Sequence, residues 1–287
     1  MPTTLTESGS QVLPEDLLDA LGAGQLVPYL GPRVLSLCPD YPVPATPEDL
    51  VAQLTAKTSV PHKIRGRLTQ SAQFIENFKH RKTLVGLMDG AFAAPARPGP
   101  LHAALASLGL PLIVDAWYDN ASFAALQAGL PPEDWGMVQG LSQSEHFGTW
   151  TGWYDGHGAP APDPKPGWKT LLYKPLGGQA PASNYLVSDS DYVEVLTEID
   201  IQTPIPAEVQ GLRTGRSFLF LGCRFNDQLP RAFARQIMKR SSDVHWAVLP
   251  DEPTRMEARF LEEQNIRRID APLEDFVAVL LEKLHTA

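Results

Sequence analysis

The chain is short of cysteine. Among its 287 residues only Cys38 and Cys223 occur, and they lie far apart in the sequence. Two isolated cysteines argue against a disulfide framework and against a cysteine-rich zinc site, and they suit a reducing compartment. We therefore expect neither disulfides nor a metal centre.

Long apolar runs are also absent. No apolar stretch approaches the roughly 20 residues that a membrane span requires. The first eight residues have neither the basic start nor the apolar run of a secretory signal. We expect a soluble, cytoplasmic protein with no membrane association.

Basic residues are outnumbered. The sequence has 24 lysines and arginines against 33 aspartates and glutamates, which gives a formal charge of −9. Such a surface repels phosphate backbones, so no nucleic-acid partner is expected. Hydrophobic residues make up 43% and charged residues 20%, enough apolar material for one large α/β domain.

The last third of the chain alternates between strand-like and helical patterns. Strands are predicted at residues 217–221, 244–249 and 267–269, and helices at 227–240, 254–264 and 272–284. This alternation predicts an α/β fold with a doubly wound, mostly parallel sheet.

The rest of the chain is less regular. Helices are predicted at 14–21, 47–57, 69–92, 102–108, 120–128 and from Asp189 onward, with strands at 25–30, 111–116, 170–174 and 185–188. Residues 130–168 place four tryptophans among glycines and prolines, either as an insert folded over a cleft or as irregular strands packed by aromatics. Residues 1–12 are predicted to be a flexible terminus and 13–287 a single domain.

Three short segments carry a family resemblance. They are LIVDAWYD at 112–119, YKPLG at 173–177 and FLFLGCRFND at 218–227. In this order they resemble the Thr-Thr-Asn-Tyr-Asp, Tyr-Lys-Leu-His-Gly and Leu-Phe-Leu-Gly-Tyr-Ser-Leu-Ser-Asp segments of the sirtuin-like (silent-information-regulator-like) family of NAD-consuming proteins. The likeness extends from about Leu13 to Leu284. It implies a Rossmann-like sheet with helical insertions, and NAD or ADP-ribose as candidate ligands.

The sequence departs from the family pattern where the chemistry is done. Trp117 stands where the family has its Asn, and Leu176 where it has its general-base His. An indole offers one donor and no acceptor, and leucine cannot take a proton. In the glycine-rich turn Gly-Ala-Gly-Val-Ser, the second glycine is replaced by Arg33. No catalytic residue is predicted, although His146 or His157 could in principle supply an imidazole.

The ligand-binding candidates all follow predicted strands. They are Gly31, Arg33, Asp115, Trp117, Asp119, Gly222, Arg224, Asn226 and Asp227. Trp117 either stacks on a ring-shaped ligand or plugs the old pocket. Arg33 and Arg224 are expected to face one another and to bind either an anionic small molecule or a loop carboxylate. Asn226 or Asp227 should cap the following helix, and Cys223 should be a small buried filler.

These residues lead to three hypotheses. The first is a catalytically degenerate binding or interaction module, with an anionic nucleotide-like ligand, a protein partner or a second copy of the chain as its partner. The alternative is an active NAD glycohydrolase, which the resemblance by itself implies. The third is a purely structural subunit with no ligand.

Overall fold

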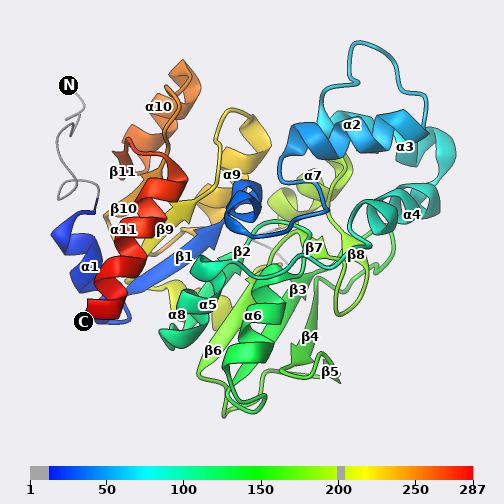
Figure 1. Cartoon of the computed structure of the whole chain (residues 1–287). Helices are drawn as coiled ribbons and strands as arrows, with labels where there is room; N and C mark the ends of the chain where they lie inside the picture. Colours follow the sequence, from blue (N-terminus) through cyan, green and yellow to red (C-terminus); the bar gives the residue numbers. More distant parts are fainter. Residues whose placement is uncertain (1–12, 199–203, 287) are drawn as a thin grey trace.

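A computed structural model describes residues 13–198 and 204–286 (Figure 1). The terminus predicted to be flexible, residues 1–12, lies outside the described residues. Nine strands form the main sheet in the order β11-β10-β9-β1-β2-β6-β3-β4-β5. Their bounds are β1 Leu26–Leu30, β2 Leu112–Asp115, β3 Trp135–Gly140, β4 Thr151–Asp155, β5 Pro160–Ala161, β6 Thr170–Lys174, β9 Ser217–Leu221, β10 His245–Val248 and β11 Ile266–Ile269.

Seven of these strands, from β11 to β3, are mutually parallel, and β4 and β5 are added antiparallel at one edge. Two short strands, β7 Gly177–Gly178 and β8 Asn184–Tyr185, pair separately. The α/β, Rossmann-like prediction is therefore confirmed. Because β1 pairs with β9 on one side and β2 on the other, the strand order reverses there, which is where such sheets bind ligands.

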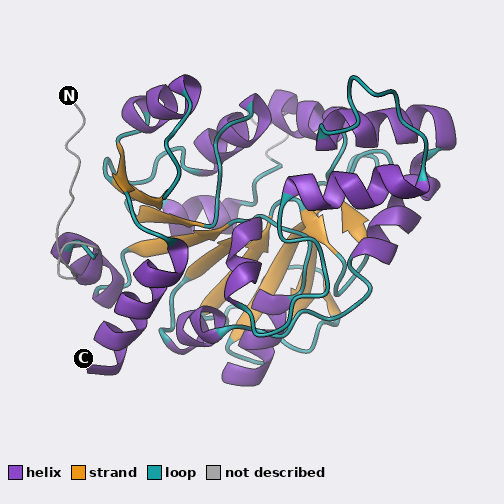
Figure 2. Cartoon of the chain, turned by 45° about the horizontal axis from the view of Figure 1, so that its top comes forward, coloured by secondary structure: helices purple, strands orange, loops and turns teal. Residues whose placement is uncertain are grey.

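Helices cover both faces of the sheet (Figure 2). One apolar cluster joins one face to α1 Glu15–Gly22, α5 Pro100–Ser107, α6 Ala121–Gly129 and α11 Leu273–Thr286. The other cluster contains residues of α2 Pro47–Lys57, α3 Leu68–Lys79, α4 Arg81–Ala91, α7 Asp189–Glu198, α8 Ala207–Arg213, α9 Gln228–Ile237 and α10 Arg255–Glu263. A 3-10 helix, η1 Pro32–Leu37, follows β1. None of the described helices combines the length and apolar character of a membrane span.

Local sequence signals explain where several helices begin. Thr46 and Asp227 accept hydrogen bonds from the first-turn amides of α2 and α9. Thr254 and Glu257 form a reciprocal capping box at α10. The parallel strand β2 is buried along its whole length because helices cover both of its faces.

The capping box gives a prediction of moderate size. Thr254→Ala removes the acceptor for the Glu257 amide and should lower the free energy of unfolding by about 1 kcal/mol in urea titration. Thr197→Ala is the control, because Thr197 is exposed and its hydroxyl donates to the carbonyl of Val193 one turn earlier within α7. Equal effects of the two substitutions would contradict the capping role.

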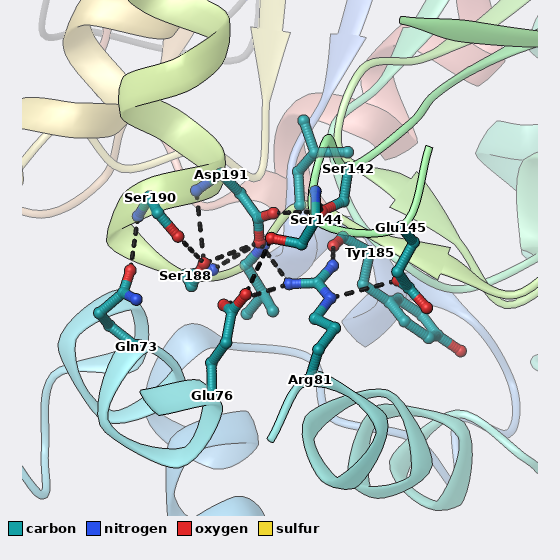
Figure 3. Close-up of polar contacts among 12 residues, drawn as sticks. Gln73, Glu76, Arg81, Ser142, Ser144, Glu145, Tyr185, Ser188, Ser190 and Asp191 are labelled. Carbon is teal, nitrogen blue, oxygen red and sulfur yellow. Dashed lines mark hydrogen bonds and ion pairs between the residues drawn. The ribbon is translucent and has the colours of Figure 1, made fainter. Parts of the chain in front are cut away.

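The prediction of a single helix at 69–92 is wrong, because the structure has two helices there, α3 and α4. His80 has a φ of 71° and separates α3 from α4. Because of the break, the side chain of the next residue, Arg81, points toward a cluster of carboxylates from α3, α7 and the β3–β4 loop (Figure 3). Helical periodicity continues through the break, so the pattern alone could not reveal it.

The Trp-rich segment is more regular than predicted. It supplies β3 inside the parallel sheet and the antiparallel edge strands β4 and β5. Trp153 and Trp168 stack with ring centroids 6.4 Å apart, and Trp135 is fully buried. The segment therefore extends the sheet and packs through its aromatic rings.

The strand predicted at 185–188 is also corrected. Only its first residue, Tyr185, lies in β8. The amides of Val187 and Ser188 instead donate to the carboxylate of Asp191, at 2.8 and 2.9 Å. The Asp191 carboxylate thus replaces the carbonyls of a neighbouring strand as the acceptor for these amides, and the chain leaves the extended conformation and begins α7.

Candidate ligand-binding site

A cavity of about 480 Å³ lies at the carboxyl ends of β1, β2 and β9. Its walls come from the loops after these strands, from the α2–α3 region, and from α7 and α9. The cavity thus opens at the point where the strand order reverses. Its size falls within the range of small-molecule sites, roughly 300–1,000 Å³.

The structure brings together most of the residues predicted from the sequence. Seven of the nine candidates line the cavity: Gly31, Arg33, Trp117, Gly222, Arg224, Asn226 and Asp227. Leu176, in the place of the family's His, lines it as well. Asp115 and Asp119 are not among the lining residues and lie buried beside it.

Gly31 and Gly222 are required because the loops that follow β1 and β9 pack closely against each other. A Cβ on Gly31 would lie 2.6 Å from the carbonyl oxygen of Gly222. A Cβ on Gly222, whose φ is 67°, would lie 2.6 Å from the amide nitrogen of Val34. Neither position tolerates a side chain, because the two loops approach each other too closely.

Because the two loops lie so close, the main-chain N–H groups of residues 31–34 donate to neighbouring carbonyls. The Gly31 amide donates to Leu221 at 2.8 Å, Arg33 to Gly222 at 3.2 Å and Val34 to Gly31 at 3.2 Å. Pro32 has no N–H. A Rossmann turn binds a pyrophosphate through free amides, and across residues 31–34 none is left for a ligand.

Trp117 forms part of the wall and leaves the cavity open. Its indole N–H donates to the carbonyl of Pro44 at 2.8 Å, which fixes the ring. Phe92 meets the ring nearly edge-on at 6.0 Å between centroids, and Tyr118 lies at 4.9 Å. The side chain is 3% exposed, yet it borders the cavity, so one part of it is available to a ligand.

Asp115 is committed to a buried ion pair. Lys174, at the end of β6, donates to the Asp115 carboxylate at 2.9 Å and to the carbonyls of Trp117 and Asp119 at 2.7 and 2.9 Å. All three donors of the ammonium group are therefore used. Asp115 and Lys174 together hold the turn that follows β2.

Asp119 has a local structural role. Its carboxylate accepts a 2.8 Å hydrogen bond from the Ala121 amide in the first turn of α6. Burial, and next the charge of Asp115, raise the pKa of Asp119 to about 6. Neither aspartate offers the cavity a free carboxylate.

Arg33 and Arg224 meet at a loop carboxylate, one of the two arrangements expected from the sequence. Arg33 Nη1 lies 3.0 Å and Arg224 Nη1 2.5 Å from the same Oδ2 of Asp251. Arg224 also binds Glu257 through Nε and Nη2, each at 2.9 Å. Burial alone would raise the pKa of Glu257, but the bonds from Arg224 and from the Thr254 and Phe225 amides lower it to about 2.

No described lining residue is a histidine. His146 and His157, which could have replaced the missing imidazole, are exposed and lie elsewhere. The thiol of Cys223 borders the cavity, but burial raises its pKa well above the usual value. The thiol therefore stays protonated and fills space, as predicted from the sequence.

Other lining residues were missed by sequence reasoning. They include Tyr29 in β1, Tyr192 in α7, Phe225 and Phe233 around α9, and residues 66–70 before and within α3. The alternation within β1 could have indicated Tyr29, because Val27 and Tyr29 face the same apolar cluster. No motif marks residues 66–70.

The described side chains do not form a metal site, but the cavity could hold a nucleotide-like group. Within residues 13–198 and 204–286, no three His, Cys, Asp or Glu side chains are grouped to hold a metal ion. A nucleotide-like group would meet the aromatic and arginine side chains of the cavity.

Comparison with known proteins agrees with this geometry. No curated protein gives a significant match. A family model described as the SIR2-like domain matches residues 111–269, which is more than half of the chain and runs from β2 to β11. The matched region contains Trp117, Leu176 and the Gly222–Asp227 loop. The chain belongs to the SIR2-like domain family.

Proposed function

We propose that this chain is a binding module that has kept the family's ligand cavity without its hydrolytic chemistry. The observation that carries the proposal is an open cavity at the strand switch point with no imidazole among its described lining residues. The family association connects such a cavity with NAD-related ligands. A ligand of this class would bind here and be released unchanged.

The lining favours an anionic, nucleotide-like ligand such as ADP-ribose or NAD. Six aromatic side chains border the cavity and offer faces or edges to a base: Tyr29, Trp117, Tyr118, Tyr192, Phe225 and Phe233. Three arginines, Arg33, Arg67 and Arg224, offer donors to phosphate groups. Arg67 is exposed, and among the residues that the structure describes its guanidinium makes one side-chain contact, at 3.4 Å, with Gln70, so its charge is available to a ligand.

The lack of an imidazole among the described lining residues argues against the family's hydrolytic chemistry. Two carboxylates border the cavity: Asp227 caps α9 by accepting the Leu229 amide, and Glu48 lies in the first turn of α2. Asp115 is paired with Lys174. A water molecule here has no neutral imidazole to take its proton near pH 7.

The direct test combines binding with turnover. ADP-ribose and NAD should raise the melting temperature of the protein, because a ligand that binds only the native state stabilises it. Incubation with NAD should release no nicotinamide above the buffer control. Steady nicotinamide release would instead establish the NAD glycohydrolase alternative, provided that an altered cavity residue abolishes it.

A pair of arginine variants locates the ligand. Arg67→Ala should weaken ADP-ribose binding roughly tenfold, the effect of losing one charge-assisted contact. Arg65→Ala is the matched control, because Arg65 is exposed nearby but does not border the cavity. Equal loss in both variants would show that the ligand binds outside the cavity.

If neither ADP-ribose nor NAD changes the melting temperature at millimolar concentration, the proposal fails. A stable complex with a protein partner would then favour the structural-subunit hypothesis. Association with a partner or with a second copy of the chain stays a prediction from the sequence.

A further inference from the structure

One side chain outside the cavity holds two of the arginines that border it. The Oδ2 atom of Asp251, in the loop between β10 and α10, accepts from Nη1 of both Arg33 and Arg224. Asp251 does not itself line the cavity. Its carboxylate therefore occupies donors that an anionic ligand group would use.

The two arginines differ in how firmly they are held. Arg224 is bound along one edge of its guanidinium by Glu257, which is fully buried and also caps α10. This leaves Nη1 of Arg224 directed to Asp251. Within the described part of the chain, Asp251 is the one carboxylate paired with Arg33.

The contact with Asp251 is exposed to solvent. The side chains of Arg33 and Asp251 are 42% and 52% exposed. Exposed ion pairs of this kind are weak because water and salt screen them. The Arg224 side chain is less exposed, at 20%, and lies 2.5 Å from Asp251. Displacing the half-exposed Asp251 should still cost less than displacing the fully buried Glu257.

The loop itself does not have to move for this displacement. Arg268 donates to the carbonyl of Leu249 at 2.9 Å and to that of Asp251 at 3.4 Å. These contacts anchor the main chain on either side of Pro250. Rotation of the Asp251 side chain alone would free Nη1 of both arginines, while Arg224 stays bound to Glu257 through Nε and Nη2.

We propose that Arg33 and Arg224 form an anion-binding pair for a phosphate or pyrophosphate group, and that Asp251 is its built-in competitor. This inference rests on the proposed function, since it names how the same cavity takes the charged part of its ligand. A pyrophosphate bridge as a whole carries more negative charge and more acceptor oxygens than one carboxylate, so it can bind both guanidinium groups at once. The main-chain turn that would normally bind phosphate is closed, and this pair takes its place.

The proposal makes Asp251 a determinant of specificity. A neutral ligand cannot displace the carboxylate, whereas a phosphorylated ligand can. The wild-type protein should therefore bind pyrophosphate only weakly, and removing the competing charge should strengthen that binding.

The test measures binding of pyrophosphate and of adenosine by titration calorimetry at one fixed low salt concentration. Asp251→Asn keeps the size of the side chain and removes its charge, and it should bind pyrophosphate roughly tenfold more tightly. Glu252→Gln is the matched control: Glu252 is the next residue, is 89% exposed and pairs with Arg268 at 3.6 Å. It makes the same change of charge and should alter the affinity less than about twofold, as expected for a screened surface charge.

Two further measurements sharpen the result. Adding Arg33→Met to Asp251→Asn should abolish the gain, and adenosine should bind the wild type and Asp251→Asn equally. An unchanged affinity of Asp251→Asn for pyrophosphate, or an equal gain in Glu252→Gln, would overturn the inference. If ADP-ribose still binds the wild-type cavity in that case, the proposed function stands alone; if no ligand binds any variant, both fail.

Discussion

Replacing Lys174 by methionine should lower the free energy of unfolding by about 3–5 kcal/mol, the cost of breaking a buried ion pair from one side. The Lys174 side chain is 1% and the Asp115 side chain 5% exposed, and their charged atoms lie 2.9 Å apart. Without the ammonium group, Asp115 is left as a buried charge, and the carbonyls of Trp117 and Asp119 lose their donor. Urea unfolding followed by circular dichroism measures the loss.

Lys169→Met is the matched control for this substitution. Lys169 lies just before β6 and pairs with Asp134 at 3.0 Å, but its side chain is 72% exposed. An exposed pair contributes about 0–1 kcal/mol, so the same chemical change should have little effect there. Adding Asp115→Asn to Lys174→Met should recover part of the loss. Similar unfolding energies for Lys174→Met and Lys169→Met would contradict a structural role for the pair.

The Asp115–Lys174 pair also shows where sequence reasoning reached its limit. The segments after β1, β2 and β9 could be placed at one site because the carboxyl ends of parallel strands meet at one edge of the sheet. In the structure, Gly31, Trp117 and Gly222 all line one cavity, and their role in binding a ligand stays a prediction. The position after a strand end could not by itself separate Asp115 from the cavity, because its partner lies 59 residues later on another strand.

The same limit applies to the polar partners of the arginines. Facing arginines were expected from the two loops, and a loop carboxylate was one of the two alternatives. Which carboxylate binds them depends on how the β10–α10 loop folds back, and the sequence around Asp251 carries no motif for this. Residues 66–70 are a similar case, because their place in the cavity wall depends on tertiary packing of α2 and α3.

Arg81 is the second position where a single substitution should have a large effect. Its guanidinium binds Asp191 at 2.9 Å, Glu145 at 3.2 Å and Glu76 at 3.4 Å, and it donates to the carbonyl of Tyr185 (Figure 3). The Arg81 side chain is 11% exposed and that of Asp191 is fully buried. Arg81→Met leaves three carboxylates close together without their cation, and we expect a loss of about 3–5 kcal/mol in unfolding free energy.

The consequence should extend from stability to the cavity. Arg81 ties α3 and α4 to α7 and to the β3–β4 loop, and the first turn of α3 borders the cavity. Hydrogen exchange in Arg81→Met should therefore accelerate throughout residues 68–91 before it does in the sheet. The stabilisation by ADP-ribose should decrease in the same variant, because ordering the helices would then cost part of the binding free energy.

Two comparisons make the role of Arg81 testable. Lys82→Met changes the neighbouring exposed cation and should alter the unfolding free energy by less than about 0.5 kcal/mol. Arg81→Lys keeps one charge for Asp191 but loses the planar set of donors, so its stability should fall between those of the wild type and Arg81→Met. If Arg81→Met unfolds like Lys82→Met and exchange over residues 68–91 is unchanged, the cluster does not hold the helical layer. The cavity wall formed by α3 must then be maintained by apolar packing alone.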